Sequence, residues 1–201
     1  HQLSKGNMAV YNMLNTRYFI MQNPSTGKVE AQLNQSAFGP VWLVKGLKFV
    51  STPDDEMGAL DHTSLSDTAV VQQKFANQIN IKPVNDSTAS IHLIQYRNDT
   101  LRYAFNAAGN QFAVFSEIYY PLGWNAYIDG KKSDYVKTDY ALRGMAIPAG
   151  RHEIEFRFEP GAYWLGDTLS VISGYIVLFL LILAVIMEIK RKEYILKSTV
   201  N

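Results

Sequence analysis

Cysteine is absent from the 201 residues, so the sequence holds no disulfide framework, no thiolate zinc site and no cysteine nucleophile. A surplus of one charge is also absent, because 19 Lys and Arg residues are balanced by 18 Asp and Glu residues. No basic block lies in the first 160 positions. We therefore expect no nucleic-acid partner, since phosphate backbones are bound by clustered positive charge.

Sequence signals for cofactors and metals are lacking as well. Gly130, Gly144 and Gly150 are spaced as turn and strand glycines rather than as a phosphate-binding loop. The four histidines are His1, His62, His92 and His152. No two of them lie four positions apart and no set of acidic partners adjoins them, so we expect no cofactor, no metal site and no catalytic triad.

A signal peptide is not visible after His1, because neither a basic n-region nor an apolar h-region follows it. We expect the sequence to be part of a longer protein. Its length suits one domain of roughly 150 to 165 residues and a membrane segment.

One long hydrophobic run is present, from Thr168 to Met187, and it carries no charge over twenty residues. At 1.5 Å per residue, such a helix spans a hydrocarbon core of about 30 Å. Thirteen of its residues are Leu, Ile, Val or Phe, which favours insertion by about 4 to 8 kcal/mol. We therefore predict one transmembrane helix within residues 163–189.

Basic residues are biased to one side of this run. Lys190, Arg191, Lys192 and Lys197 follow it, whereas Arg157 is the only basic residue among the fifteen that precede it. The positive-inside rule then places the tail, residues 190–201, in the cytoplasm. Residues before about 167 are expected outside the cytoplasm of a bacterial cell.

The region 34–162 has the alternation of a β-rich domain. His152 to Phe158 reads HEIEFRF, with apolar and charged side chains alternating, and Leu101–Phe105 and Gln111–Tyr120 also indicate strands. Asp129-Gly130 predicts a tight hairpin. Turns are also expected at Asn98-Asp99 and at 148–150. The predicted fold is mainly β, an antiparallel β-sandwich or jelly-roll-like extracytoplasmic domain plus the C-terminal helix.

The rest of the chain is less regular. Residues 1–33 indicate a helix that leads into a strand, and VWLVKGLKFV at 41–50 indicates one or two strands. Asp54–Leu60 is expected to be a short helix, because Pro53 suits its first turn and its first residues are acidic.

The segment Phe115–Gly166, with the hydrophobic run after it, resembles the C-terminal end of the YfhO family of bacterial membrane proteins. Weaker motifs of that family correspond to MLNTRYFI at 13–20, AFGPVWLV at 37–44 and SDTAVV at 66–71. The second motif departs from the family at Pro40-Val41, where a small polar pair is more usual.

The resemblance implies a multi-pass parent protein, similar to membrane glycosyltransferases that take sugars from polyprenyl-phosphate carriers and modify cell-envelope polymers or lipids. Its expected partners are the lipid bilayer, upstream transmembrane helices of the same chain, and a glycan or lipid-linked sugar. In that class the catalytic acid lies in an early extracytoplasmic loop near the N-terminus. The resemblance therefore assigns no catalytic residue here.

One cluster of residues is a candidate carbohydrate contact, because aromatic rings stack on sugars and carboxylates accept hydrogen bonds from their hydroxyls. Its members are Glu117, Tyr119, Tyr120, Trp124, Tyr127 and Asp129. The structural alternative is that the aromatic residues pack in the core or near the membrane, Glu117 pairs with an arginine such as Arg143, and Asp129 serves the turn.

Three functions remain open. The first is a non-catalytic extracytoplasmic domain and last membrane anchor of a glycosyltransferase-like protein. The second is a carbohydrate-binding module anchored by a single helix. The third is a glycoside hydrolase, which would need two carboxyl groups held about 5 to 10 Å apart across a cleft.

Overall fold

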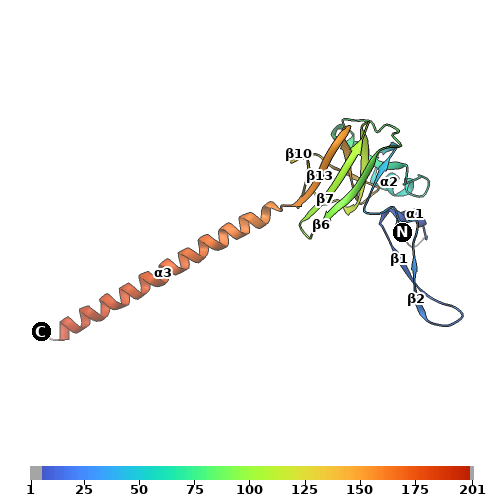
Figure 1. Cartoon of the computed structure of the whole chain (residues 1–201). Helices are drawn as coiled ribbons and strands as arrows, with labels where there is room; N and C mark the ends of the chain where they lie inside the picture. The colour runs from blue at the N-terminus through green and yellow to red at the C-terminus, as the bar shows by residue number, and fades with distance from the viewer. Residues whose placement is uncertain (1–5, 200–201) are drawn as a thin grey trace. The chain divides into compact units, whose positions relative to one another are not determined.

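The computed structural model describes residues 6–199, so His1 lies outside the described residues. The chain divides into two units, one that ends at Phe158 and one that begins at Glu159 (Figure 1). The first unit is built mainly from strands and the second is a single apolar helix. The predicted mainly β fold with one C-terminal apolar helix is confirmed.

The first sheet of the β unit has five strands, and all neighbouring pairs are antiparallel. In spatial order they are β10 (Lys131–Ser133), β9 (Trp124–Ile128), β13 (Gly150–Phe158), β7 (Thr100–Ala107) and β6 (Ser90–Tyr96). The predicted turns at 98–99, 129–130 and 148–150 connect β6 to β7, β9 to β10 and β12 to β13, so these predictions are confirmed.

The second sheet has six strands. In order they are β3 (Val41–Val44), β8 (Gln111–Ile118), β12 (Leu142–Ile147), β11 (Val136–Thr138), β5 (Thr68–Gln72) and β4 (Gly46–Val50). Strands β4 and β5 pair in parallel, which departs from the all-antiparallel expectation. A parallel pair needs a crossover, and the chain between these strands supplies one that includes helix α2 (Pro53–Ala59).

Two apolar cores lie on opposite faces of the six-stranded sheet. Ala113 and Phe115 of β8 belong to a core that both sheets share, with Tyr103, Ile154 and residues of β9 and β12. Phe112 and the other alternate side chains of β8 belong to a second core, under helices α1 (Met8–Met13) and α2 and the short helix η1 (Gln73–Gln78). Strand β8 is therefore buried on both sides from Phe112 to Phe115, which explains the continuous apolar sequence of this part.

Helix α2 begins as its sequence predicts. Thr52 caps it by accepting a hydrogen bond from the backbone N–H of Asp55, while the Asp55 carboxylate accepts from the backbone N–H of Thr52. Pro53 occupies the first helical position, where its missing N–H costs no hydrogen bond. The short helix expected at 54–60 is thus confirmed.

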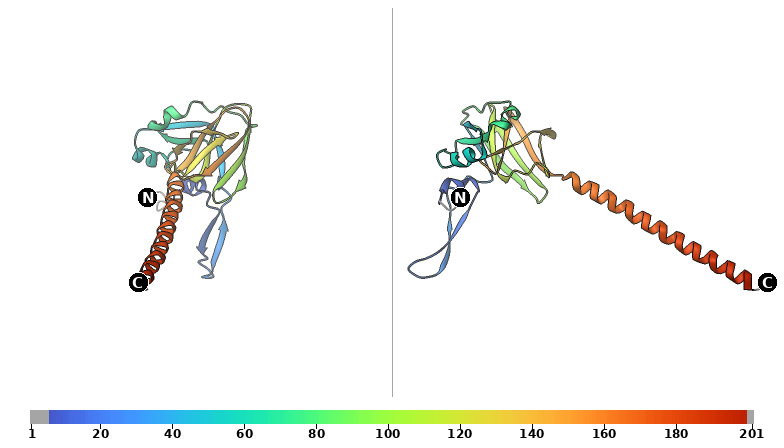
Figure 2. Two further views of the ribbon diagram at one scale, coloured as in Figure 1. Left: turned by 90° about the vertical axis from the view of Figure 1, so that its left-hand side faces the viewer. Right: turned by 180° about the vertical axis from the view of Figure 1, so that it is seen from behind.

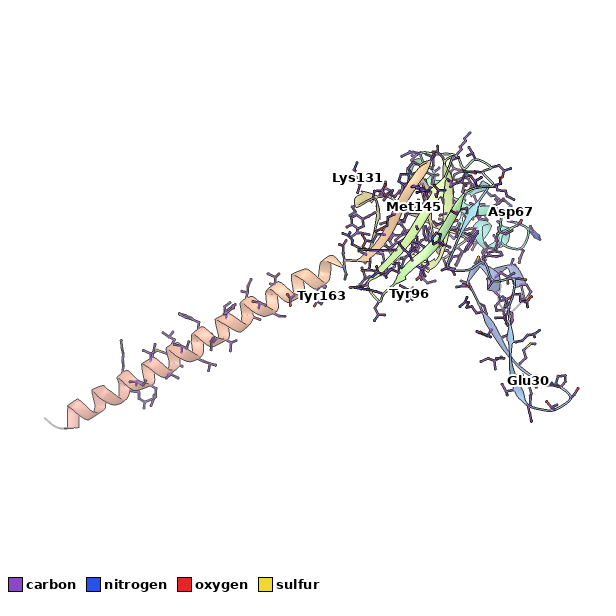
Figure 3. The ribbon with its side chains drawn as sticks, viewed as in Figure 1. Glu30, Asp67, Tyr96, Lys131, Met145 and Tyr163 are labelled. Atoms are coloured by element: carbon purple, nitrogen blue, oxygen red, sulfur yellow. The ribbon has the colours of Figure 1, made fainter. Side chains whose placement is uncertain are left out.

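A separate hairpin extends from the β unit, away from the two sheets (Figures 1 and 2). It consists of β1 (Tyr18–Gln22) and β2 (Val29–Leu33), which pair antiparallel, with Ile20 opposite Ala31. Glu30, labelled in Figure 3, lies on it. The hairpin follows α1, in agreement with the helix and strand expected within residues 1–33.

The second unit is helix α3 (Gly161–Thr199). Its part from Gly166 to Arg191 is long and apolar enough to cross a membrane, and it contains the predicted run Thr168–Met187. No side chain in the qualifying apolar window is buried against other parts of the described chain, as a lipid-facing helix requires.

Candidate functional site

The candidate residues from the sequence lie at two ends of strand β9. Trp124 begins this strand and Asp129 follows its last residue. At about 3.3 Å per residue the two are roughly 17 Å apart. Trp124 and Glu117 lie near Arg143, whereas Asp129 lies at the hairpin to β10. The structure therefore separates the two carboxylates that the sequence analysis grouped.

At the hairpin end of β9, Asp129 has a structural role in the turn. Asp129 and Gly130 have φ values of 51° and 75°, the left-handed conformations that a tight hairpin needs. The Asp129 carboxylate accepts hydrogen bonds from Nδ1 of His152, at 2.6 Å, and from the backbone N–H of Glu153, at 2.9 Å. Both bonds lower the pKa of Asp129, and the bond from His152 has the larger effect. Sequence spacing suggested no acidic partner for His152; the pairing of β9 with β13 provides it.

Tyr127 lies on the polar face of the same sheet, and the Arg157 guanidinium lies 4.5 Å from the centre of its ring. Arg157 and Arg102 both donate hydrogen bonds to the carboxylate of Glu155, with 3.1 Å from Arg102 Nε. The hydrogen bond from Arg157 is the main reason why the pKa of Glu155 is lowered. The charges of this face are thus paired with one another, and Tyr127 is covered by one of them.

At the other end of β9, Trp124 packs on the buried guanidinium of Arg143. Arg143 of β12 is 2% exposed, and its guanidinium carbon lies 4.4 Å from the ring centre of Trp124 and 5.1 Å from that of Phe156. Its Nε donates a hydrogen bond to the carbonyl of Ile118 at 3.0 Å, but Nη1 is buried and has no hydrogen-bond partner among the described residues. Burial lowers the pKa of Arg143, and the nearby Glu117 opposes this effect.

Tyrosines complete this cluster. The hydroxyl of Tyr135 donates a hydrogen bond to the carbonyl of Trp124 at 2.9 Å, and its ring lies edge to face with those of Tyr119 and Phe156. Burial raises the pKa of Tyr135 to about 12. We call Arg143, Glu117, Tyr119, Trp124, Tyr135 and Phe156 the Arg143 cluster. The packing role that the sequence analysis weighed for Trp124 and Tyr119 fits these contacts.

Glu117 is the acidic member of the Arg143 cluster. It lies near the end of β8 and is half-buried, and its carboxylate makes no hydrogen bond or ion pair with any described residue. Burial raises its pKa, and the charge of Arg143 acts in the opposite direction. The two groups interact at a distance, without the ion pair considered from the sequence. A carboxylate and a guanidinium N–H thus lie close to each other with unused hydrogen-bonding capacity.

Glu117 also lines a cleft of about 620 Å³. The cleft lies where β6 of one sheet meets β3 of the other, and Pro40-Val41 form part of its wall. Its polar lining residues are Asn15, Arg17, His92, Tyr96, Ser116 and Glu117. Tyr96, labelled in Figure 3, is 67% exposed and presents an aromatic ring at the end of β6.

The sequence analysis missed Tyr96, Asn15 and Arg17, because they come from segments far from Glu117 in the chain. An aromatic ring, an amide, a guanidinium, a hydroxyl and a carboxylate around one cleft can hold a polar ligand the size of a sugar. Glu117 is the only carboxylate that lines it within the part of the chain that the structure describes. In the same part, no group of three or more His, Asp or Glu side chains is arranged to hold a metal ion.

Tyr120 is exposed and lies outside the cleft, in the loop between β8 and β9. A Cβ atom at Gly123 in this loop would come within 2.3 Å of the Phe158 ring and 2.9 Å of the Tyr120 ring. Glycine at 123 therefore lets this loop pack closely against the end of β13.

The combination of a two-sheet β unit with one apolar helix of membrane-spanning length defines a membrane-anchored β domain. Residues 58–170, more than half of the chain, match the family model described as bacterial membrane protein YfhO. The chain belongs to this family, so it is a bacterial membrane protein. No curated protein and no solved structure matches it.

Proposed function

We propose that residues 34–162 form a non-catalytic extracytoplasmic domain that binds a glycan. In this proposal α3 is the last membrane anchor of a multi-pass glycosyltransferase, which uses a polyprenyl-phosphate sugar and modifies cell-envelope polymers or lipids. Membership in the YfhO family supports the membrane setting. The basic residues after the apolar run, which include Lys190 and Arg191, support an outside location for the domain.

The observation that carries the binding role is the cleft beside Glu117. Its half-buried carboxylate faces the cleft and makes no hydrogen bond with a described residue, so a ligand or water in the cleft can satisfy it. The exposed ring of Tyr96 at the same cleft offers a surface on which a sugar ring can stack. A glycan hydroxyl would donate to Glu117.

The glycoside hydrolase is the second candidate, because the raised pKa of Glu117 is the property of a general acid. A hydrolase also needs a second carboxylate across the cleft. Asp129, the partner weighed from the sequence, lies at the far end of β9 and is bound by His152. We therefore favour binding without catalysis.

Binding can be tested by the response to cleft substitutions. The purified chain should bind glycans of the cell envelope and should neither hydrolyse them nor transfer sugar from a polyprenyl-phosphate donor. Tyr96→Ala and Glu117→Gln should each weaken binding about tenfold, as expected for loss of one stacking or hydrogen-bonding contact. The matched control is Glu153→Gln, which changes an exposed carboxylate of β13 in the five-stranded sheet, outside the cleft.

Hydrolysis that is abolished by Glu117→Gln would instead establish the second candidate. In the parent protein, the same cleft substitutions should lower envelope glycosylation while the amount of protein in the membrane stays constant. A fall in both quantities would indicate lost stability rather than lost glycan binding.

Orientation can be tested separately, because the native chain has no cysteine. Lys132→Cys lies on an exposed position of β10, and Ser198→Cys lies in the basic tail. An impermeant thiol reagent added to spheroplasts should label only position 132. Labelling of position 198 alone would reverse the proposed orientation.

A further inference from the structure

One end of the β unit carries a group of exposed apolar side chains. It is the end at which β6, β8 and β13 finish, and the backbone N–H of Phe158 there donates to the carbonyl of Asp99 in the turn from β6 to β7. We call this group the apolar rim. Its members are Ile94, Ile118, Tyr120, Leu122 and Phe158.

The apolar rim is unusual for a water-exposed surface. Leu122 is 78% exposed at the tip of its loop, although the loop itself is held in place by the close packing of Gly123 against Phe158. The opposite end of the sheets consists of the loops 84–89, 108–110 and 148–149. In those loops Val84 is the only large aliphatic or aromatic side chain that is exposed. Of these two ends, the one that carries the rim therefore has more exposed apolar surface.

The chain itself connects this end to the membrane segment. Strand β13 finishes at Phe158, a member of the apolar rim, and α3 begins at Gly161 after Glu159 and Pro160. The part of α3 that can span a membrane begins at Gly166. Two extended residues and a short helical stretch reach no further than about 20 Å. The covalent connection therefore keeps Phe158 within about 20 Å of the first residue that can enter the membrane.

From these observations we propose that the apolar rim rests in the headgroup region of the lipid bilayer. The headgroup region is about 6 Å deep on each side of the hydrocarbon core, enough to receive the side chains of Leu122 and Tyr120. Tyrosine suits this depth because its ring is apolar and its hydroxyl is polar. Arg97, exposed in the turn next to Tyr96, can bind lipid phosphates there. The proposal requires only membrane anchoring and holds whether or not the parent protein transfers sugar.

The absence of cysteine allows a direct test in the whole chain. Leu122→Cys places one thiol on the apolar rim, and the matched control Ser87→Cys places one at the opposite end, about 25 Å away along β7. Both native side chains are exposed, so neither substitution should disturb folding. Each variant is labelled with an environment-sensitive fluorophore. It is then reconstituted into vesicles of phosphatidylethanolamine and phosphatidylglycerol that contain a lipid with a nitroxide in its headgroup region.

We expect the fluorophore at position 122 to lose more than half of its emission to the nitroxide lipid and to be shielded from aqueous iodide. The fluorophore at position 87 should keep nearly all of its emission and be quenched by iodide. Equal behaviour of the two positions would overturn the proposal. Shielding of position 122 from both quenchers would also overturn it, because a protein surface would then cover the rim. Matching thermal unfolding of the two variants verifies that both remain folded.

Discussion

The two ends of strand β9 differ in how they treat a carboxylate. At the hairpin end, Asp129 is exposed, yet its oxygens are bound by His152 and by the backbone of Glu153. At the other end, Glu117 is half-buried, yet no described residue donates a hydrogen bond to it. The surroundings therefore lower the pKa of Asp129 and raise that of Glu117.

This difference separates a structural carboxylate from a candidate ligand contact. Partial burial of a carboxylate without a hydrogen-bond partner costs free energy, and the attraction between Glu117 and Arg143 offsets only part of this cost. Asp129 has a complete structural explanation in its turn and its hydrogen bonds. In the Arg143 cluster, structure explains the packing of the aromatic rings but not the unpartnered Glu117 carboxylate. We therefore assign ligand binding to the Trp124 end of β9.

The largest effect should come from Arg143→Ala. Removing a side chain that is 2% exposed leaves a cavity between Trp124 and Phe156, and we expect a loss of about 3 to 4 kcal/mol in the free energy of unfolding. Arg143→Met is the control, because it fills most of the volume and removes the buried charge. It should lose less than about 1 kcal/mol. Urea unfolding of both variants measures the difference, and an equal loss would mean that the charge itself stabilises the fold.

Trp124→Ala should have the next largest effect. Trp124 packs on Arg143 and, with 5.3 Å between ring centres, on Phe158, but it is only half-buried. We expect a loss of about 2 to 3 kcal/mol in thermal or urea unfolding. In a double variant that also carries Asp129→Asn, the total loss should equal the sum of the two single losses within about 0.5 kcal/mol, since the two ends of β9 are far apart. A larger coupling would show that the two ends of β9 are not independent.

Glu117→Gln should stabilise the domain slightly at pH 7, by no more than about 1 kcal/mol, because the half-buried carboxylate keeps part of its hydration. The pKa of Glu117 is raised in the folded state, so its cost is present above that raised pKa. The cost disappears as the pH falls below the ordinary Glu value of about 4.3. Unfolding measured between neutral and acidic pH should show the variant's advantage vanish. A loss of stability at pH 7 would show that Glu117 has a structural partner.

Asp129→Asn should have the smallest effect, with a loss of less than about 1 kcal/mol, because the bond to His152 is exposed to solvent. The stability contribution of Asp129 depends on pH in the opposite direction to that of Glu117. The pKa of Asp129 is lowered, so its contribution is full above the ordinary Asp value of about 3.9 and is lost as the pH falls through the lowered pKa. Thermal unfolding in acid should therefore converge for the variant and the native chain. Divergence would contradict this assignment.

Local patterns were enough to predict individual elements. The alternation in HEIEFRF identified β13, and Asp129-Gly130 identified the hairpin that follows β9. Pro53 and the acidic residues after it indicated the start of α2, and the run Thr168–Met187 lies within α3. These features depend on backbone conformation and side-chain period, which neighbouring residues determine.

The candidate site was only partly within reach of the sequence. Glu117 was identified from the sequence, but it was grouped with Asp129 because the two residues are close in the chain. Strand β9 separates them, since an extended strand carries residues apart by about 3.3 Å each. Tyr96 and Arg17 reach the cleft from distant segments, and their sequence neighbourhoods contain no pattern that points to Glu117.

The sequence by itself therefore determined the mainly β character, the apolar helix, the turns and the family resemblance, because each depends on local composition and spacing. Only the tertiary structure decided that β4 and β5 pair in parallel, that His152 meets Asp129, and that Glu117 and Arg143 are left with unused hydrogen-bonding groups. These outcomes depend on strand order and burial, which arise from packing between residues far apart in the chain.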